Sequence, residues 1–530
     1  MINQGDRVIF EVTNYHQRGE TIMAQGVLPF KYEEEKRDTG MTALAGLPVY
    51  MDLASAMGMH ESIERHLHIK QQGWTDRQTL MSLILMNLAG GDCVNDLVKL
   101  EGDSGFCRVL RRIEQRGMKR RERREMDRRW RKEQGRTVPS PSAVFRYLSA
   151  FHDANQEKLR AESDKKAFIP APNENLQGLA RVNGDMVCYV QRQNPLKVAT
   201  LDQDATLVET TKLDALYSYK GYRAYQPLNT WWAEQELVLH TEFRDGNVPA
   251  GYEQLRVFKE ALAMLPEGVE KVCLRSDTAG YQHDLLRYCE KGENERFGRI
   301  EFAIGCDVTL EFKKAALETG DKDWQSIYKE FNGHRMKTNQ EWAEVCFIPA
   351  AIGYSKSSPV YRYLAIREVI GSMELPGMEM PQQSFPFPTM QVSSQRYKLF
   401  GLVTNMDWAG EKLIHWHRER CGKSEEAHSV MKEDLAGGKL PSDDFGENAA
   451  WWWIMILAMN LNSSMKRLAL GESWIPRRMK AIRFSFINIP GRIIERSREL
   501  IIRLVKGNSA INLLLEARIR IMALAGAPSG

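Results

Sequence analysis

The stretch Lys197–Leu207, KVATLDQDATL, alternates at period two along its length. Such alternation is typical of a β-strand, in which successive side chains point to opposite faces. It places Asp202 and Asp204 on one face of the predicted strand. Two acids on one face of a strand in an apolar context favour a functional role, so we take this strand as the centre of the fold.

Strand and helix patterns alternate downstream of this stretch. Because interleaved strands and helices are typical of a sheet covered by helices, the sequence predicts an α/β fold here. The predicted strands are 219–228 (YKGYRAYQPL), 236–243 (ELVLHTEF), Val272–Asp277 (VCLRSD) and Ile300–Asp307 (IEFAIGCD), and the predicted helices are Tyr252–Leu265 and Tyr281–Lys291.

Residues 310–408 carry mainly extended patterns, such as EWAEVCFIP and YRYLAIREVI, and predict an all-β insertion. Helical patterns return at Lys423–Leu435 and Asn448–Leu468. The second of these contains Trp451, Trp452 and Trp453, which cannot all point to one side of a helix, although most of the run is expected in the core.

Upstream of the central strand, apolar residues between Thr42 and Phe106 have helical spacing, and residues 161–195 read as a linker. The tail Arg492–Leu524 reads as a basic helical segment. The length of 530 residues exceeds what one compact core usually holds. We therefore divide the chain into a helical N-terminal domain (1–165), an α/β core in two parts (166–309 and 409–470), the all-β insertion (310–408) and a helical C-terminal region (471–530).

The positive charge is concentrated in two blocks, although the formal net charge is only +4. Residues 108–136 hold fourteen Lys or Arg against five acids, and residues 466–506 hold eleven against three. Two basic blocks are a plausible contact surface for a polyanion such as DNA, although a solvated charged helix explains the first block equally well. The candidate DNA-binding residues in that block are Arg120, Arg121, Arg123 and Arg124.

The eight cysteines are scattered and form no CxxC pair, which argues against a zinc knuckle and fits free thiols in a reducing cytoplasm. The N-terminus lacks the apolar block of a signal peptide, and the longest strongly apolar stretch has eleven residues, too few to cross a membrane. We therefore expect a cytoplasmic protein with no membrane contact.

Three acids stand where phosphodiester chemistry would need them. Asp204 lies on the first strand of the α/β region, Asp277 ends a later strand, and Glu425 lies early in a helix. Two divalent cations can activate an attacking oxygen and stabilise a leaving one, and Mg²⁺ prefers carboxylate ligands. Each acid alone is more often a cap or a salt-bridge partner, so their order along the chain carries the prediction.

Four segments together resemble the DDE transposases of bacterial insertion sequences, most closely the 1380-type group. They are TLDQDATLVET, VCLRSDTAGY, RCGKSEEAHSVMKEDLAGG and FGENAAWWWIMILAMNL, and the resemblance extends over about residues 40–515. It implies an RNase H-like catalytic core, a DNA-binding N-terminal domain and a homodimer that brings two transposon ends together. The implied partners are double-stranded terminal inverted repeats and target DNA, and the implied cofactor is two Mg²⁺ or Mn²⁺ ions.

The resemblance assigns the catalytic triad to Asp204, Asp277 and Glu425. Asp202 matches a second acid two residues before the first Asp, so the choice between Asp202 and Asp204 as metal ligand stays open. Lys432 stands seven residues after Glu425, as in the family's E-x6-K spacing, and Glu426 is the alternative if the alignment shifts by one. Lys432 would contact the DNA backbone.

The sequence departs from the family at two positions before Glu425. The family's Tyr and Arg, seven and four residues earlier, are here Arg418 and Cys421, and Arg420 is the candidate replacement for the missing Arg.

The function that the resemblance implies is cleavage at transposon ends with strand transfer into target DNA. A DNA-binding relative that has lost chemistry, and a nuclease that cuts without joining, remain the alternatives.

Overall fold

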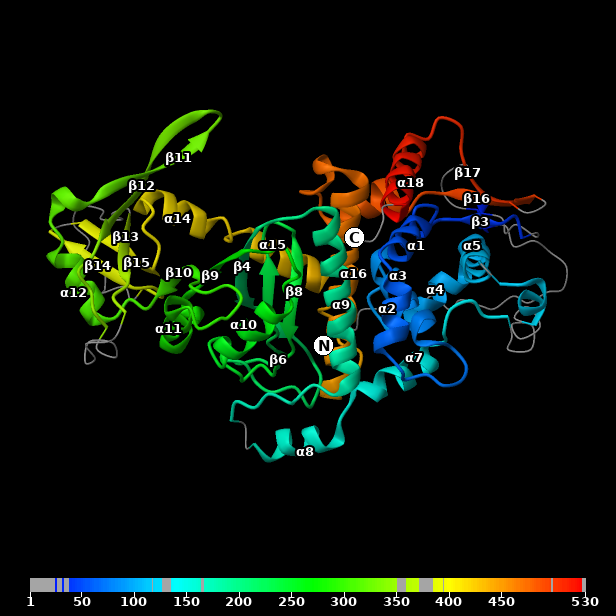
Figure 1. Ribbon diagram of the computed structural model, residues 1–530, viewed down its shortest axis with the longest axis horizontal. Coiled ribbons are helices and arrows are strands. Elements are labelled where there is room, and N and C mark those ends of the chain that lie inside the picture. Colours follow the sequence, from blue (N-terminus) through cyan, green and yellow to red (C-terminus); the bar gives the residue numbers. More distant parts are fainter. Residues whose placement is uncertain are drawn as a thin grey trace, which may run out of the picture.

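The computed structural model describes residues 24–25, 31–32, 38–116, 118–125, 135–163, 166–349, 359–370, 385–393, 395–496 and 499–526. It is a mixed α/β protein built around one large sheet (Figure 1). The N-terminal helices lie at the right of that view together with the C-terminal segments, and the β-rich part lies at the left. Among the described helices, none combines the length and apolar composition needed to cross a lipid bilayer.

The ten-stranded sheet has the order β11-β12-β13-β15-β10-β9-β4-β7-β8, with β14 paired to β15. Strand β4 (Val198–Ala205) is parallel to β9 (Lys271–Ser276), which is parallel to β10 (Glu301–Cys306). The remaining neighbours are antiparallel. Their bounds are β7 Leu228–Trp232, β8 Leu237–Glu242, β11 Gln325–Phe331, β12 His334–Glu344, β13 Arg362–Val369, β14 Thr389–Val392 and β15 Gln395–Thr404.

The predicted central strand is present, and both of its faces are covered by protein. In β4, residues Ala199–Gln203 are all buried, although the sequence alternates. This is the burial expected of a central strand in a sheet with helices packed against it. The helices that contact the sheet include α9 (Glu174–Gln193), α10 (Gln254–Ala263), α11 (His283–Lys291), α14 (Gly410–Arg418) and α16 (Phe445–Ser464).

Residues 310–408 are not all β, and their strands do not form a sheet of their own. The segment begins with helix α12 (Leu310–Glu318), whose N-cap Thr309 accepts a hydrogen bond from the Phe312 amide. Its last strand, β15, pairs antiparallel with β10. The inserted strands therefore extend the central sheet at its β10 edge, a register that extended patterns alone cannot reveal.

The predicted linker at 161–195 is wrong, because α9 occupies twenty of its residues. The Asn173 side chain accepts a hydrogen bond from the Leu176 amide and caps the helix. The glycines that weaken the helical pattern serve close packing. A Cβ on Gly178 would lie 2.5 Å from the His66 carbonyl oxygen, and one on Gly184 would lie 2.8 Å from the Met264 methyl.

Helix α16 passes through the interior, so the run Trp451–Trp453 is buried entirely. The helix packs against α9 and β8 on the sheet side and against α3 (Asp76–Ala89) of the N-terminal helices. The Trp451 indole donates to the Ala436 carbonyl and the Trp452 indole donates to the Thr241 hydroxyl. A helix enclosed on several sides has no solvent face, which is why three consecutive tryptophans can all be inside.

The N-terminal region is helical, as predicted, and several of its helices pack against the C-terminal segments (Figure 1). A Cβ on Gly46 would overlap the Phe486 backbone, which shows how closely the two ends of the chain approach. The helices are α1 Leu47–Ala56, α2 Met59–His66, α3, α4 Leu97–Gly102, α5 Ser104–Glu114, α7 Pro141–Leu148 and α8 Ala154–Glu162.

The predicted helical C-terminal region is partly wrong. Strands β16 (Gly491–Arg496) and β17 (Glu499–Leu504) form an antiparallel hairpin, and β16 also pairs with β3 (Met41–Thr42). In β16, exposed Arg492 alternates with buried Gly491 and Ile493, which is a strand period that the basic composition obscured. The last segment, α18 (Ala510–Gly526), is helical as predicted.

Candidate active site

Asp204 and Asp277 lie side by side at the same end of the sheet. Strands β4 and β9 run parallel with Gln203 opposite Ser276. The residues that come next, Asp204 and Asp277, therefore lie next to each other. Asp277 also caps the following turn, because its carboxylate accepts a hydrogen bond from the Ala279 amide at 3.1 Å. Functional residues commonly collect where parallel strands end, and this pair occupies such a position.

Asp202 lies on the same strand but has a different environment. Its two carboxylate oxygens accept hydrogen bonds from Arg275 Nε and Nη2 at 2.6 and 2.9 Å, and both side chains are buried. Because Arg275 engages both oxygens of the Asp202 carboxylate, it occupies the positions from which that carboxylate would bind a metal ion. Arg275 also donates to the Trp416 carbonyl and to Glu419, so it ties the end of β9 to the end of α14.

Asp204 is held by the segment that follows α14. The Arg420 guanidinium lies 3.3 Å from Asp204 Oδ2, and the Ser424 hydroxyl donates to the same oxygen. Both contacts come from residues within five positions of Glu425. The helix that carries the predicted third acid is therefore anchored to the predicted first acid.

Glu425 lies on α15 (Lys423–Ser429) and is exposed. The next turn is a π-helix, Val430–Asp434, a shape found frequently at functional sites. It contains Lys432, whose ammonium group donates to the Leu207 carbonyl at 3.2 Å, just beyond β4. The alternative acid Glu426 interacts electrostatically with Lys466, a residue of the segment after α16.

The three acids do not form a closed cage in this structure. Among the described residues, one group of three possible ligands has its atoms within 4.8 Å of one another, and it is Asp92, Cys93 and Asp96. A site with two ions about 4 Å apart does not require such a closed cage, since different acids can hold different ions. The carboxylate donors and the paired strand ends fit a divalent cation at Asp204 and Asp277.

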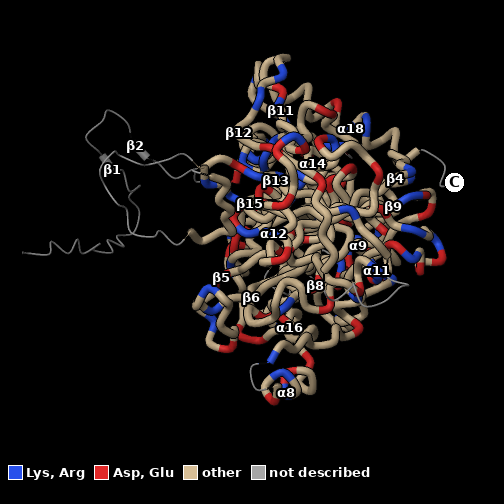
Figure 2. Tube along the Cα trace, turned by 90° about the vertical axis from the view of Figure 1, so that its left-hand side faces the viewer, with Lys and Arg blue, Asp and Glu red and all other residues tan. Residues whose placement is uncertain are grey.

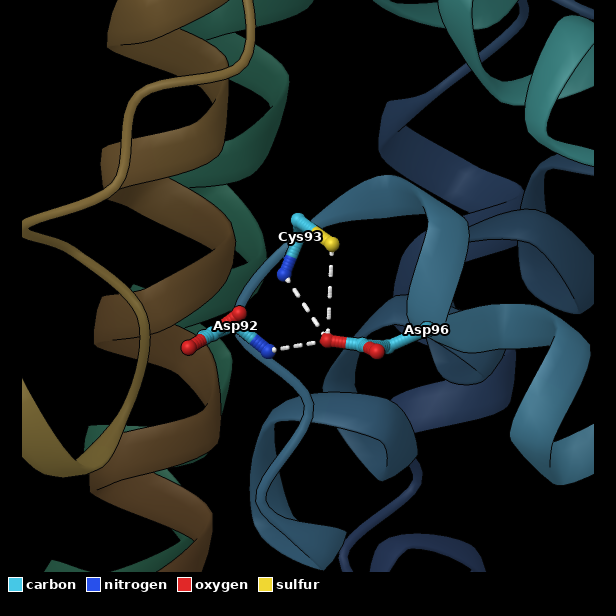
Figure 3. A group of neighbouring side chains, drawn as sticks. All are labelled: Asp92, Cys93 and Asp96. Carbon is cyan, nitrogen blue, oxygen red and sulfur yellow. Dashed lines mark hydrogen bonds between the residues drawn. The ribbon is translucent and has the colours of Figure 1, made fainter. Parts of the chain in front are cut away.

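The Asp92, Cys93 and Asp96 group is a helix cap (Figure 3). One Asp96 oxygen accepts hydrogen bonds from the Asp92 and Cys93 amides, at 2.9 and 3.3 Å, and from the Cys93 thiol. The other Asp96 oxygen pairs with Lys99 at 2.6 Å. These contacts account for the cluster without a metal ion.

The carboxylates of Asp204 and Asp277 repel each other, and a cation bound between them would offset this repulsion. Asp277 reaches the surface at the mouth of a cleft. Loss of solvation by the surrounding protein nevertheless raises the pKa of its carboxyl group, and the negative charge of Asp204 raises it further. Burial lowers the pKa of His417 and His428 to about 4, so both imidazoles are neutral at pH 7. His417 Nε2 donates to the Ser276 carbonyl at 2.9 Å and so supports the strand end before Asp277.

A cleft of about 940 Å³ opens beside Asp277. One side is formed by the end of α14 and the turn after it, including Arg418 and Arg420, and the other by the apolar surface of β15, including Phe400. A cleft with cationic and apolar walls at an acidic strand end can hold a phosphate backbone against the carboxylates.

The candidate DNA-binding arginines lie far from this cleft along the fold, after α5. Arg120, Arg121 and Arg124 are exposed, whereas Arg123 lines a cavity between α1, α3 and α5. The rest of that basic block, residues 126–134, lies outside the described residues. Elsewhere in the trace, Lys and Arg are interspersed with Asp and Glu (Figure 2).

Several residues near the acids were not foreseen from the sequence. Arg275 could have been found, because a charge inside a buried strand requires a partner and Asp202 is in register with it. Ser424 gave no such signal. A further feature is the loop at 210–223, where Tyr217 and Tyr219 are 61% and 77% exposed beside basic residues.

This loop belongs to the same end of the sheet as the acids. Lys220 is close enough to Lys432 that its charge adds to burial in lowering the pKa of the Lys432 ammonium group. Arg223 holds the loop in shape, since it donates to the Leu213 and Ala215 carbonyls. The two tyrosines therefore project from an ordered base.

The comparison with protein-family models confirms the broader expectation of a DDE transposase and does not test the 1380-type group. A family model described as the transposase DDE domain, group 1, matches residues 35–525. A solved structure, piggyBac transposase in a synaptic complex with hairpin DNA, is similar at 10% identity over 92% of this chain and 83% of that chain. Its TM-score of 0.38 is too low to establish a common fold. No curated protein matches the chain. Because the family match spans nearly the whole length, the chain belongs to the transposase DDE domain family, group 1.

Proposed function

We propose that this chain cleaves DNA at transposon ends and joins the freed ends to target DNA. The observation that carries the proposal is the parallel register of β4 and β9, which sets Asp204 beside Asp277 in a chain of this family. Within the family, the four quoted segments favour the 1380-type insertion sequences.

The sheet order supports an RNase H-like core. Taken along the chain, β4, β7, β8, β9 and β10 are the first to fifth strands, and they lie in the order 3-2-1-4-5. The first three are antiparallel and the last two run parallel to the first. This arrangement puts the first and fourth strands together, with Asp204 on the first strand and Asp277 directly after the fourth.

Asp204 and Asp277 would hold the divalent cations, and Glu425 would complete the ligand set from α15. Two bound Mg²⁺ or Mn²⁺ ions would supply an activated oxygen nucleophile and stabilise the leaving oxygen. Asp202 serves Arg275 and is the weaker candidate for a ligand. The exposure of Glu425 leaves it free to turn toward the cations.

The side chains around the acids would bind and orient the DNA. Lys432 and Lys220 provide positive charge beyond the end of β4, and Arg418 and Arg420 provide it along the cleft. Tyr217 and Tyr219 offer aromatic faces on which bases can stack. The helical N-terminal domain, with Arg120, Arg121, Arg123 and Arg124, would bind the terminal repeats mainly through phosphates, and a homodimer would bring two ends together.

The test is a cleavage and joining assay on DNA that carries the sequences flanking the gene, with Mg²⁺ and a target plasmid. The wild-type chain is expected to cut at the ends and to yield joined product. Asp277→Asn is expected to lose cleavage by a factor of at least about 10³, because it removes a metal ligand, while binding to the same DNA persists.

Other outcomes separate the alternatives. Cutting without joined product would identify a nuclease. Binding without any cutting by the wild-type chain would identify a relative that has lost catalytic activity. The departures from the family pattern at Arg418 and Cys421 are the reason to test this alternative. Full cleavage by Asp277→Asn would remove this aspartate from the active site.

A further inference from the structure

Asp204 has one cationic partner within ion-pair distance in the described part of the chain, and it is Arg420. The Arg420 side chain is 8% exposed, and its guanidinium lies 3.3 Å from Asp204 Oδ2. Asp202, two residues earlier, has its own bidentate partner in Arg275. Arg420 thus lies against the same carboxylate that a bound cation would need as a ligand.

Arg420 is not fully satisfied in this position. Its Nε is buried and has no hydrogen-bond partner. An orphaned donor on a buried guanidinium costs free energy, and a second anionic acceptor would recover it. The same side chain lines the cleft of about 940 Å³ beside Asp277, so such an acceptor could enter from the solvent.

The positive charge of Arg420 acts on the neighbouring carboxyl groups and would also act on a bound cation. Its charge lowers the pKa of both Asp202 and Asp277, after the larger effects of burial and the nearer groups. A divalent cation on Asp204 would repel the guanidinium at this distance, because two positive charges a few ångströms apart interact unfavourably in a partly buried site. The ion pair and the bound metal therefore compete for the same carboxylate.

We propose that Arg420 is the counter-ion that a divalent cation displaces from Asp204, and that the displaced guanidinium then binds a DNA phosphate in the cleft. This inference rests on the proposed function, because it takes Asp204 as a metal ligand. Planar guanidinium groups suit both partners, since they bind carboxylate and phosphate with the same donor geometry.

The exchange links metal binding to DNA binding. A DNA phosphate that binds Arg420 lowers the free-energy cost of breaking the Arg420–Asp204 ion pair. DNA therefore strengthens metal binding, and the metal strengthens DNA binding by the same factor. In the absence of DNA, Arg420 holds the metal affinity down. Chemistry is then confined to the protein that has DNA in its cleft.

The first test measures Mn²⁺ affinity of the full chain without DNA by isothermal titration calorimetry. Arg420→Gln is expected to bind Mn²⁺ at least about 10-fold more tightly than the wild type, because the competing cation is gone. Arg418→Gln is the matched control, since it removes the same charge from the same cleft but no contact with Asp204. It is expected to change the affinity less than about 3-fold.

Two outcomes distinguish this inference from the proposed function. If Asp204→Asn and Asp277→Asn still bind Mn²⁺ as the wild type does, the metal site itself is wrong. If those variants lose Mn²⁺ but Arg420→Gln binds it no more tightly than the wild type, the metal site stands and the exchange is overturned.

A second measurement follows the exchange in the wild-type chain and uses a variant only to assign a resonance. The arginine Nε–Hε resonance of Arg420 in the wild-type chain, assigned by its absence in Arg420→Gln, is followed by NMR. It is expected to shift on addition of Mg²⁺ and to shift again when a short DNA duplex is added. A resonance that does not change at saturating Mg²⁺ would overturn the exchange.

Discussion

At the scale of single residues, the two aspartates of β4 divide between structure and chemistry. Asp202 is buried in a bidentate pair with Arg275, whereas Asp204 is partly exposed and is held by Arg420 and Ser424. The sequence places both acids on one face and cannot separate them. The separation comes from β9, whose register brings Arg275 opposite Asp202.

This division predicts that the same substitution has different consequences at the two positions. Asp202→Asn leaves the buried Arg275 charge without its partner and is expected to lower stability by about 3 kcal/mol. Asp204→Asn is expected to abolish cleavage and to lower stability by less, because it removes the single 3.3 Å contact with Arg420 rather than a bidentate pair. Thermal unfolding and the cleavage assay on both variants check this, and a larger stability loss for Asp204→Asn would reverse the assignment.

A third carboxyl group, Glu114 on α5, makes stability depend on pH. Burial raises the pKa of Glu114 to about 7 from 4.5, although Gln78 donates a hydrogen bond to it. The folded chain then keeps a proton that the unfolded chain loses above pH 4.5. The contribution of Glu114 is therefore most favourable at low pH and is lost as the pH rises toward 7, by roughly 3 kcal/mol.

Replacing Glu114 by Gln removes this dependence. The melting temperature of Glu114→Gln relative to the wild type is expected to be higher at about pH 8 than at about pH 5, since only the wild type must bury or protonate a carboxylate. The same difference in melting temperature at both pH values would show that Glu114 is not protonated in the folded chain.

At the scale of elements, the loop at 210–223 provides a test of how DNA is held near the acids. Tyr217→Ala together with Tyr219→Ala is expected to weaken single-stranded DNA binding by about 1–3 kcal/mol per base stacked, with the salt dependence unchanged. Fluorescence anisotropy at several salt concentrations measures both quantities. Unaltered affinity would leave these tyrosines as surface residues without a role in binding.

The basic segment after α5 supplies the matched contrast. Neutralising Arg120, Arg121 and Arg124, which are exposed, is expected to weaken duplex binding and to flatten its salt dependence, because each phosphate contact releases counter-ions. Arg123 lines a cavity and is expected to contribute less. An unchanged salt slope would make this segment an ordinary solvated helix.

The elements that sequence reasoning found and missed differ in physical terms. Strand β4 was predicted from its alternating pattern and β9 and β10 from short strand patterns, all of which are local signals. Helix α9 was missed because Gly178 and Gly184, which break the pattern, are required by close contacts with α2 and Met264. The β16–β17 hairpin was missed because its basic composition obscured the strand period, and its pairing with β3 joins residues some 450 positions apart, a contact with no local signature.

At the scale of the whole molecule, the sheet and α16 join segments that the sequence suggested as separate domains. Helix α16 packs between the sheet and the N-terminal helices, and β15 extends the central sheet from the inserted segment. The candidate site was accessible to sequence reasoning as far as Asp204, Asp277 and the helix of Glu425. Its supporting contacts, from Arg275, His417 and Ser424, depend on register and on helix placement, which the sequence does not display.

The central claim is that Asp204 and Asp277 hold divalent cations for cleavage. The most direct measurement is anomalous X-ray diffraction from crystals of the full chain soaked in Mn²⁺. We expect an anomalous peak within coordination distance of the Asp204 and Asp277 carboxylates, with Arg420 moved away from Asp204. Peaks confined to other places, or a peak on Asp202 with its Arg275 pair broken, would contradict the account.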